Sequence, residues 1–310
     1  MPDRTLPTAS PRSTSPSMGP PRMEWRAVLE LFKPVTWFPP VWAFACGVVA
    51  SGAPVGGRWG LVALGLLLAG PMVCATSQAV NDWFDRHVDA INEPNRPIPS
   101  GRIPGRMGLW IAIAWTLASL LVGLTLGPWG FGATLLALAL AWAYSAPPLR
   151  LKQDGWWGNT ATGLSYETLP WLTAAAVMAG GAPDWRMMLV ALLYGIGAHG
   201  IMTLNDFKAI EGDRRMGIAS LPARHGPVAA AWIACVFMAV PQVVVVALLA
   251  LWGAPWLALG IAGLLAAQLG FMGRMLRDPK ALAPWYNATG VMAYVVGMML
   301  AAVALRGLAA

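Results

Sequence analysis

Residues 81–89 read Asn81-Asp82-Trp83-Phe84-Asp85-Arg86-His87-Val88-Asp89, and they directly follow an apolar run over residues 59–80. The same kind of opening recurs after another apolar run, where the chain reads Asn205-Asp206-Phe207-Lys208-Ala209-Ile210-Glu211-Gly212-Asp213. The chain has 14 Asp and Glu residues, and six of them fall in these two windows. A carboxylate at depth in a membrane helix costs about 2.5–3.5 kcal/mol on insertion scales. Acids gathered twice at the ends of apolar runs therefore indicate a functional site.

The composition of the chain is typical of a membrane protein. Of its 310 residues 57% are hydrophobic and only 11% are charged, whereas a soluble domain carries about 25% charged residues. Apolar stretches long enough to cross a bilayer as helices recur along the whole chain. We therefore predict an all-α integral membrane protein with nine transmembrane helices. The expected spans are residues 37–52, 59–80, 107–126, 129–145, 159–180, 185–204, 228–251, 254–273 and 285–306.

The basic residues are distributed unevenly around these expected spans. The net charge is +7, and 18 of the 21 Lys and Arg residues fall on one side of the membrane if there are nine spans. Such an asymmetry follows the positive-inside rule and excludes the nucleic-acid binding that a basic chain otherwise suggests. We expect a cytoplasmic N-terminus, a C-terminus on the opposite side, and both acidic windows at the cytoplasmic face. The three remaining basic residues are Arg58, Arg186 and Arg306.

The N-terminal segment differs in composition from the rest. Residues 1–22 are rich in Pro, Ser and Thr and lack an apolar core, which indicates a disordered tail with no secretory signal peptide. We divide the chain into a disordered cytoplasmic tail, residues 1–30, and a single transmembrane domain, residues 31–310. Cys46, Cys74 and Cys235 are isolated in apolar spans, so we expect no disulfide or metal role for them.

The two acidic windows suggest an internal repeat. Their openings are 124 residues apart and end the second and the sixth expected span. The loops that follow are also alike, with Pro97-Ile98-Pro99-Ser100-Gly101 after one window and Ile218-Ala219-Ser220-Leu221-Pro222 after the other. We expect two four-helix pseudo-repeats plus a ninth helix. Membrane folds built from repeats commonly hold a shared site where the repeats meet.

The acids in the two windows suit a metal site. On one α-helix Asp82, Asp85 and Asp89 share a face, as Asp206 and Asp213 do if their helix continues. Oxygen ligands without clustered Cys or His favour a hard cation such as Mg²⁺, which commonly binds a few carboxylates together with substrate phosphates. We therefore expect Mg²⁺ ions that hold a diphosphate between the windows, with Asp82, Asp85, Asp206 and Asp213 as catalytic acids. The candidate metal ligands are Asn81, Asp82, Asp85, Asp89, Asp206, Glu211 and Asp213.

Basic and aromatic side chains near the windows complete this hypothesis. Each base alone also serves as a topology marker, but acids and bases together on one face favour anion binding. A bound cation takes up charge as a diphosphate leaves, and an allylic carbocation needs a dry pocket with aromatic faces. Trp83 and Trp171 are further aromatic candidates. The candidate substrate-binding residues are Arg86, Arg96, Tyr144, Arg150, Lys152, Tyr166, Lys208 and Arg214.

These motifs resemble those of the UbiA superfamily of intramembrane aromatic prenyltransferases. The shared features are the Asn-Asp-x-x-Asp-x-x-x-Asp motif at residues 81–89, the second acidic window and the Tyr-Ser-x-Pro-Pro-x-Arg-x-Lys segment at residues 144–152. The resemblance runs from about residue 30 onward and implies a nine-helix bundle that uses Mg²⁺. One position departs from the family pattern, because Ala209 stands where the second motif usually has its earlier acid. Asp206 and Glu211 are the local substitutes.

Within the superfamily the chain is most similar to the chlorophyll and bacteriochlorophyll synthase branch. The matching segments are residues 33–40, 89–101, 166–171 and 205–214. The resemblance implies that the propionate of bacteriochlorophyllide or chlorophyllide is esterified with a geranylgeranyl or phytyl chain from its diphosphate. It also implies a bacterial cytoplasmic or intracytoplasmic photosynthetic membrane, with pigment-assembly proteins as possible partners. A propionate is ionised near pH 7, so the acceptor needs no general base.

Several alternatives stay open at this point. Another prenyltransferase of the superfamily would use a quinone precursor or haem as its acceptor. A cation-coupled transporter would use the acids as ion sites, although transporter sites favour the middle of the membrane. A pigment-assembly scaffold would lack catalysis. His199, seven residues before Asp206, either lines the pocket, ligates the magnesium of a macrocycle, or is a packed polar residue.

Overall fold

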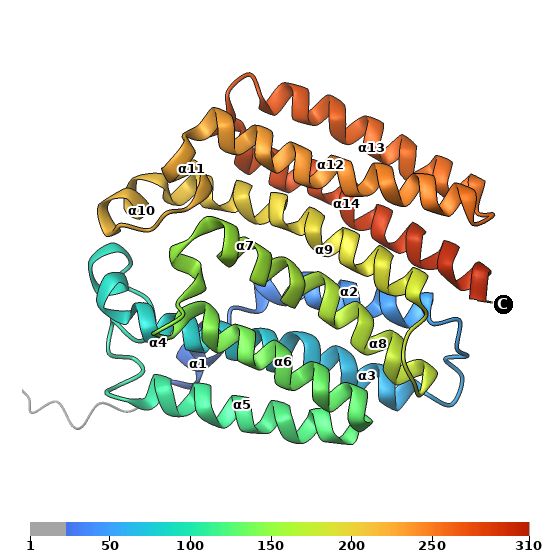
Figure 1. Ribbon diagram of the computed structural model, residues 1–310. Helices are drawn as coiled ribbons and strands as arrows, with labels where there is room; N and C mark the ends of the chain where they lie inside the picture. Colours follow the sequence, from blue (N-terminus) through green and yellow to red (C-terminus); the bar gives the residue numbers. More distant parts are fainter. Residues whose placement is uncertain (1–22, 310) are drawn as a thin grey trace, which may run out of the picture.

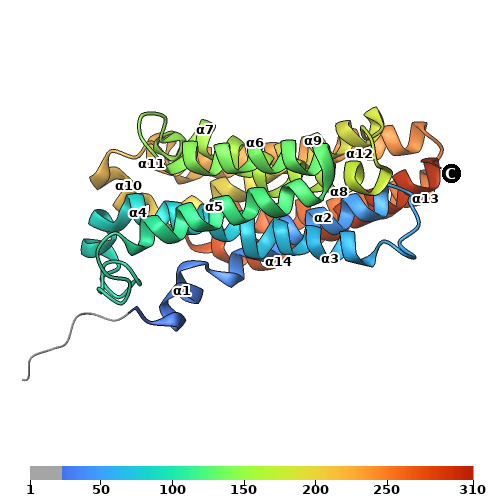
Figure 2. The ribbon, with the colours of Figure 1, turned by 90° about the horizontal axis from the view of Figure 1, so that it is seen from below.

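The computed structural model describes residues 23–309, and within that range the regular structure is entirely helical (Figure 1). Long helices lie side by side with their axes roughly aligned, and the view from below shows the same arrangement (Figure 2). Six helical segments of this range are long and apolar enough to cross a membrane. They are Trp59–Asn92, Met107–Thr125, Trp185–Met216, Pro227–Leu251, Pro255–Met275 and Pro279–Leu308.

The other predicted spans also contain helices, but these are not among the six. Helix α2 has only 13 residues, and the segment over residues 155–179 is interrupted by a π-helical stretch, η4. The structure therefore supports an all-helical membrane fold without confirming a count of nine spans. The bounds of these helices are α2 Phe38–Ala50, α6 Gly127–Ser145, α7 Gly155–Gly163, η4 Leu164–Thr168 and α8 Leu169–Ala179.

Two of the six segments are each composed of several helical elements. The first segment consists of three consecutive elements, α3, η2 and α4, and the third also consists of three, α9, η5 and α10. The first-segment elements are α3 Trp59–Leu67, η2 Leu68–Cys74 and α4 Ala75–Asn92, and those of the third are α9 Trp185–Asn205, η5 Asp206–Ala209 and α10 Ile210–Met216. The remaining elements are α5 Met107–Thr125, α11 Leu221–His225, α12 Pro227–Leu251, α13 Pro255–Met275 and α14 Pro279–Ala309.

The structure shows more regular structure near the N-terminus than the sequence predicts. Residues 1–22 of the predicted tail lie outside the described residues, but helix α1 occupies Trp25–Leu31 and the 3₁₀ helix η1 occupies Pro34–Trp37. Ala27 and Leu31 of α1 are buried in a hydrophobic cluster with residues of α4. The predicted boundary after residue 30 thus falls within α1, which apolar packing orders.

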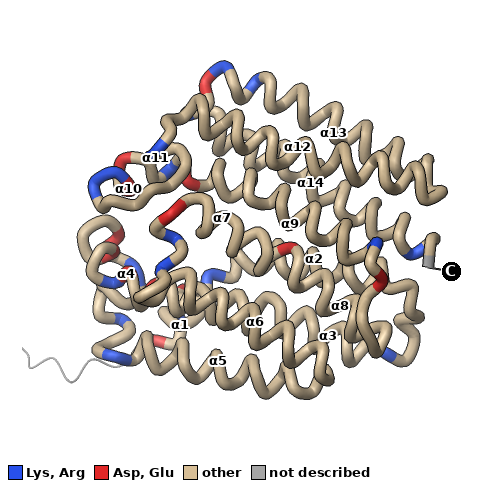
Figure 3. Tube along the Cα trace, in the orientation of Figure 1, with Lys and Arg blue, Asp and Glu red and all other residues tan. Residues whose placement is uncertain are grey.

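Charged residues are concentrated at the ends of the bundle (Figure 3). The end formed by α4, α10 and α11 carries most of them, and the long middle of the bundle is nearly free of charge. This pattern is expected when the middle lies in a hydrocarbon layer, where unpaired charges are costly. The charged end is the one to which both acidic windows belong.

Close helix packing aligns the elements around the second acidic window. A Cβ added to Gly163 of α7 would lie 2.4 Å from the carbonyl oxygen of Gly195 on α9, so these helices touch through their backbones. Small residues permit such close approach between membrane helices. The contact brings Asn159, one turn earlier on α7, to within hydrogen-bond distance of Asp206, at 3.3 Å. A larger residue at position 163 would separate the two helices.

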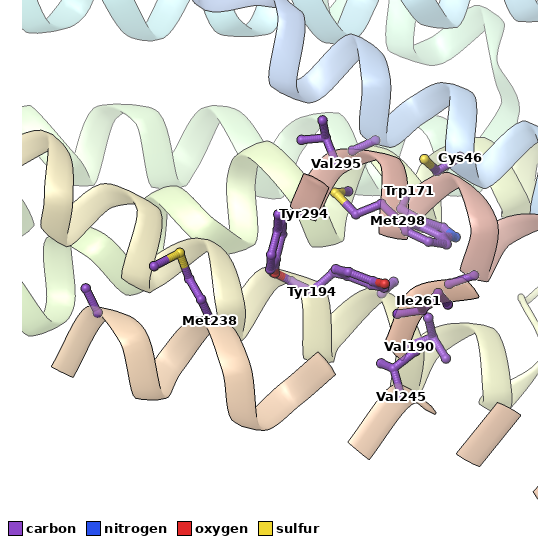
Figure 4. Packing of buried hydrophobic residues seen from close by; sticks show 14 of the residues in the cluster. Cys46, Trp171, Val190, Tyr194, Met238, Val245, Ile261, Tyr294, Val295 and Met298 are labelled. Atoms are coloured by element: carbon purple, nitrogen blue, oxygen red, sulfur yellow. The ribbon is translucent and has the colours of Figure 1, made fainter. Parts of the chain in front are cut away.

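The main hydrophobic core lies among α2, α8, α9, α12, α13 and α14. Figure 4 shows Trp171, Tyr194 and Tyr294 together in this core. The rings of Trp171 and Tyr194 are stacked with centroids 5.9 Å apart, and the Tyr294 hydroxyl donates a 2.6 Å hydrogen bond to the Tyr194 carbonyl oxygen. Aromatic pairs of this kind contribute about 0.5–1.5 kcal/mol beyond the area that they bury. This core holds α8 and α9 against each other.

Candidate active site

All the acids of the first window lie on one helix. The helix begun by α3 and η2 does not end at residue 80, as the span prediction has it, but continues in α4 to Asn92. Pro71 lies in the π-helical stretch η2 and removes a backbone donor there, and such stretches are frequent at functional sites. The continuation of the helix gives Asp82, Asp85 and Asp89 the regular spacing that the sequence predicts.

Each acid on α4 is paired with a base from another part of the chain. The Lys33 ammonium lies 2.7 Å from Asp82 Oδ1, and a guanidinium nitrogen of Arg96 lies 2.8 Å from Asp89 Oδ2 and 3.5 Å from Asp82 Oδ1. Asp82 is 1% exposed, so its pairing satisfies a charge that water does not reach. The segment of Lys33 and the loop of Arg96 thus meet at this end of α4.

Asp85 faces the segment that follows α6. Its carboxylate lies 2.6 Å from the Lys152 ammonium and 3.4 Å from an Arg150 guanidinium nitrogen. Burial lowers the pKa of the Lys152 ammonium, and the Asp85 carboxylate opposes that shift. Two of the predicted substrate-binding bases are therefore beside a predicted catalytic acid.

Lys33, which the sequence analysis did not identify, pairs with the predicted site residue Asp82. Within residues 23–309 the only non-glycine residues with a positive φ are Lys33, at 45°, and Arg150, at 40°. Such a conformation costs of order 1–3 kcal/mol and concentrates at functional sites. Both residues direct cations at acids of α4. Because Lys33 is 49 positions away from Asp82, only its place before the first span hinted at this role.

The second window is divided between short elements. A 3₁₀ turn, η5, separates α9 from α10, so Asp206 and Asp213 do not share the face of one continuous helix. Asp206 Oδ2 accepts a hydrogen bond from the Asn159 amide, and Asp213 Oδ2 accepts one of 2.5 Å from the Ser220 hydroxyl. The sequence analysis placed Asp206 and Asp213 on a common face only if their helix continued, and the turn η5 interrupts that helix.

The loops at the charged end are tied to one another. A parallel β-bridge joins Asp154 and Ala219, with hydrogen bonds of 2.9 Å from Gly155 N and 2.8 Å to Gln153 O. It links the segment that carries Arg150 and Lys152 to the loop after the second window. On the other side Arg102 holds Glu30 by two hydrogen bonds, and this contact lowers the pKa of the Glu30 carboxyl. The two acidic windows are thus connected through backbone and side-chain contacts.

A cavity of about 410 Å³ lies between the helices that carry the windows. Both Asn81 and Asn205, the first residues of the two windows, line it. On α9 the lining residues are Ala198, Ile201, Met202 and Asn205, which are spaced along one helix face. Tyr144 and Tyr166 also line the cavity, and Tyr166 accepts a 3.0 Å hydrogen bond from Gln78. Each of the two windows therefore contributes its first residue to the lining of one cavity.

The oxygen donors that line this cavity, together with the acids next to them in sequence, fit a divalent cation. Within residues 23–309 no group of three or more His, Cys, Asp and Glu side chains is close enough together to hold a metal ion. However, Asp82 Oδ2 is fully buried and has no hydrogen-bond partner among the described residues, which leaves a hard oxygen ligand free. Asn81 and Asn205, which directly precede Asp82 and Asp206, line the cavity, and the Asn205 amide oxygen accepts a 2.8 Å hydrogen bond from Asn287. The fit concerns the chemical type of the ligands. To bind a metal ion, the acids would have to release their present basic partners.

Most predicted site residues, including every Asp of the two windows, are not among the residues that line the cavity. Arg86 donates to the Trp83 carbonyl oxygen, and its guanidinium lies 3.9 Å from the centre of the Trp83 ring. Glu211 is 65% exposed in its side chain and pairs with Lys280 at the surface. Lys208 and Arg214 are also exposed. Local contacts of this kind cannot be read from proximity in sequence.

The aromatic candidates are divided in the same way. Tyr144 and Tyr166 line the cavity, whereas Trp171 and Trp83 are packed in hydrophobic clusters. His199 is 2% exposed, and its ring is stacked on that of Phe237 with centroids 4.3 Å apart. It is not among the lining residues of the cavity, which supports its interpretation as a packed polar residue.

This arrangement combines an acidic and basic rim with an apolar interior. Paired carboxylates and ammonium or guanidinium groups can exchange partners with a cation and a phosphate-bearing anion. The cavity below the rim is lined mainly by apolar side chains and admits a hydrocarbon chain. The geometry defines a membrane-embedded site for an amphiphilic molecule with an anionic head.

Comparison with known proteins identifies the family. The model of the UbiA prenyltransferase family matches residues 37–296. The bacteriochlorophyll synthase 33 kDa chain of Cereibacter sphaeroides is 60% identical over 92% of this chain and 94% of its own length. The chloroplastic chlorophyll synthase of Arabidopsis thaliana is 38% identical over 91% of this chain and 75% of its own length. The chain therefore belongs to the UbiA prenyltransferase family and is a multi-pass membrane prenyltransferase.

Solved structures agree with the fold. The structure of a UbiA homolog from Archaeoglobus fulgidus bound to GPP and Mg²⁺ covers 88% of this chain and 99% of its own length, with a TM-score of 0.65. The two sequences are 20% identical, so this likeness concerns the fold. Membership of a family of transferases decides against the cation-coupled transporter considered above.

The pairing of Lys33 with Asp82 predicts a large stability effect. Lys33→Met leaves the buried Asp82 carboxylate with only the more distant Arg96 guanidinium, and breaking a buried pair costs about 3–5 kcal/mol. Lys280→Met is the matched control, because it removes a Lys from an exposed pair that contributes about 0–1 kcal/mol. Thermal unfolding in detergent should show a much larger loss for Lys33→Met. Equal small losses would contradict the assignment of Lys33 to the site.

Proposed function

We propose that this chain esterifies the propionate of bacteriochlorophyllide with a geranylgeranyl or phytyl chain taken from its diphosphate. The observation that carries the proposal is the meeting of both Asn-Asp windows at one cavity with a charged rim and an apolar interior. The identity to bacteriochlorophyll synthase, 60%, exceeds that to chlorophyll synthase, 38%, and this favours the bacteriochlorin acceptor over the chlorin.

The metal in this proposal is Mg²⁺, held by acids of both windows. Asp82, Asp85, Asp206 and Asp213 would be its principal ligands, with Asn81 and Asp89 nearby. The exposed position of Glu211 argues against its inclusion. A bound Mg²⁺ would neutralise charge on the diphosphate, and structures of a UbiA homolog from Archaeoglobus fulgidus are bound to Mg²⁺ with DMAPP or with GPP.

The bases at the rim would bind the diphosphate. Lys33, Arg96, Arg150 and Lys152 already contact the acids of α4, so an anion that brings its own cations can replace those carboxylates at each base. Strained backbone at Lys33 and Arg150 keeps two of these cations directed at the site. The chain thereby orients the bond between C1 and the diphosphate oxygen.

The protein does not need to activate the acceptor. A propionate oxygen forms a bond to C1 of the prenyl chain while the C1–O bond breaks and the electron pair leaves with the diphosphate. The carboxylate is already ionised near neutral pH, so no general base is required. The remaining tasks are to align the two reactants and to keep out water, and the apolar cavity wall provides for both.

We also propose the finer architecture and its orientation. The short α2, the helix α6 and the interrupted α7–η4–α8 segment would join the six long segments to give nine spans. The two windows would mark two pseudo-repeats related across the cavity. The charged end would face the cytoplasm of a bacterial cytoplasmic or intracytoplasmic membrane, with pigment-assembly proteins as possible partners. Residues from about 25 onward would form one domain.

Loss of a metal ligand should abolish turnover without unfolding the protein. Asp85→Ala removes a carboxylate that is partly exposed and whose role is in binding, so the variant should remain folded in detergent. Asp278→Ala, which changes an acid of the same end away from the cavity, is the matched control and should stay active. EDTA should abolish the activity of the wild type, and Mg²⁺ should restore it. Full turnover in Asp85→Ala or in EDTA would refute the metal assignment.

The product should be an ester. Mild alkali should cleave the prenylated tetrapyrrole back to the free acid, and turnover should stay flat from about pH 6 to pH 9 because a propionate is fully ionised there. A phenolic acceptor, with a pKa near 10, would instead give activity that rises toward pH 9–10. Product analysis after saponification checks the first point. A product that resists alkali would assign the chain to a quinone-precursor or haem branch of the family.

The orientation can be tested with reporter fusions. Fusions after residues 105 and 225 should report the cytoplasm, because both positions lie at the charged end, whereas fusions at residue 181 and at the C-terminus should report the opposite side. A reporter such as alkaline phosphatase, active only outside the cytoplasm, distinguishes the two. A cytoplasmic C-terminus would show that the number of spans is even.

A further inference from the structure

The cavity wall carries one acid that the proposed reaction does not use. Glu167 lies in the π-helical stretch η4 and lines the cavity, although the residue is only 5% exposed. Its Oε2 atom is fully buried and has no hydrogen-bond partner among residues 23–309. Buried polar groups are almost always paired, and an ionisable residue inside a membrane protein is a functional candidate by default. The free carboxyl group therefore indicates that Glu167 binds a ligand in the cavity.

The surroundings of Glu167 favour the neutral carboxylic acid. None of the residues that line the cavity is a Lys or Arg. An ionised carboxylate without a partner in apolar surroundings is far more costly than a neutral acid. Beside an allylic diphosphate an ionised carboxylate would also compete with the acceptor as a nucleophile. A neutral Glu167 avoids both problems and has an O–H group to donate.

The donor substrate does not explain this O–H group. Apolar residues of η2 and α6, among them Ala69, Val73 and Leu140, form part of the same cavity wall and suit a prenyl chain. Beyond its diphosphate a prenyl chain has no hydrogen-bond acceptor. A tetrapyrrole ring, in contrast, carries carbonyl groups at its edge. The acceptor is thus the substrate whose chemistry matches a buried hydrogen-bond donor.

The distance along the helix between Asn159 and Glu167 also suits a bound acceptor ring. Asn159, which contacts Asp206, and Glu167 are eight residues apart, or about 12 Å of helix. A ring whose propionate lies at the acidic rim extends into the cavity over a comparable length. Glu167 is therefore placed beside the body of the ring and away from its reacting carboxylate.

We propose that Glu167 binds the acceptor, with its neutral carboxylic acid donating a hydrogen bond to a carbonyl oxygen of the tetrapyrrole ring. This inference rests on the proposed function and adds the residue that selects the ring. Glu167 makes and breaks no covalent bond in the reaction. Its contribution is to acceptor affinity and alignment, and it leaves binding of the prenyl diphosphate unaffected.

The experiment measures acceptor binding apart from turnover. Purified protein in detergent, without Mg²⁺ or diphosphate, is titrated with bacteriochlorophyllide, and the absorption and fluorescence of the ring report the Kd. Glu167→Gln keeps an N–H donor, and Glu167→Leu removes it. Thr168→Val is the matched control, because Thr168 is equally buried but donates to the Ala191 carbonyl oxygen and does not line the cavity. A parallel titration uses the same ring without its central magnesium.

We expect Glu167→Leu to weaken acceptor binding about tenfold, which corresponds to one buried hydrogen bond, with and without the central magnesium. Glu167→Gln should stay within about threefold of the wild type, and Thr168→Val should bind normally. With Mg²⁺ present, all variants should bind a non-reactive prenyl diphosphate analogue like the wild type.

Three outcomes would overturn the role of Glu167. They are unchanged acceptor binding in Glu167→Leu, a Glu167→Gln variant as weak as Glu167→Leu, and a loss confined to the ring that contains magnesium. The last would mean that the carboxylate ligates the ring metal. A wild-type protein that binds the diphosphate but no tetrapyrrole would instead overturn the proposed function.

Discussion

The need to pair buried carboxylates determines how the charged end of this protein is built. Asp82 and Asp89 are almost inaccessible to water, and an uncompensated charge there would cost several kcal/mol. Each acid of α4 is therefore paired with a base from outside the helix: Lys33 before α2, Arg96 in the loop after α4, and Lys152 after α6. These pairs hold the loops against the end of α4. They also assemble the cations and carboxylates that a metal diphosphate requires, so the contacts that organise the loops are those that the ligand would replace.

Features governed by local sequence could be predicted. Apolar runs long enough to span a bilayer marked every long helix, because burial in hydrocarbon favours helices whatever their neighbours are. The regular spacing of acids in the first window follows from a single continuous helix, α4. The joint approach of Asn81 and Asn205 to one cavity was anticipated from the repeated motif. The resemblance to known prenyltransferases added the family, and the comparison confirmed it.

Features governed by tertiary contacts could not be predicted. Arg86 lies among the acids in sequence, but stacking on the Trp83 ring and a carbonyl three residues back hold it away from them. The 3₁₀ turn at η5 separates the acids of the second window, which a regular helix would have aligned. Lys33 and Glu167 were passed over because their importance comes from partners, or from the lack of one, that only the folded chain reveals. A search for unpaired bases just before a first span would have found Lys33.

The central claim is that the two acidic windows bind one ligand together. A double-mutant cycle tests it directly, with Asp85→Asn in the first window and Asp206→Asn in the second, each alone and combined. Calorimetry measures the binding of a non-reactive thio analogue of geranylgeranyl diphosphate in the presence of Mg²⁺. If both acids hold the same metal diphosphate, the binding losses should be non-additive by about 0.5–3 kcal/mol. Losses that add within about 0.3–0.5 kcal/mol would mean independent sites and would contradict this account.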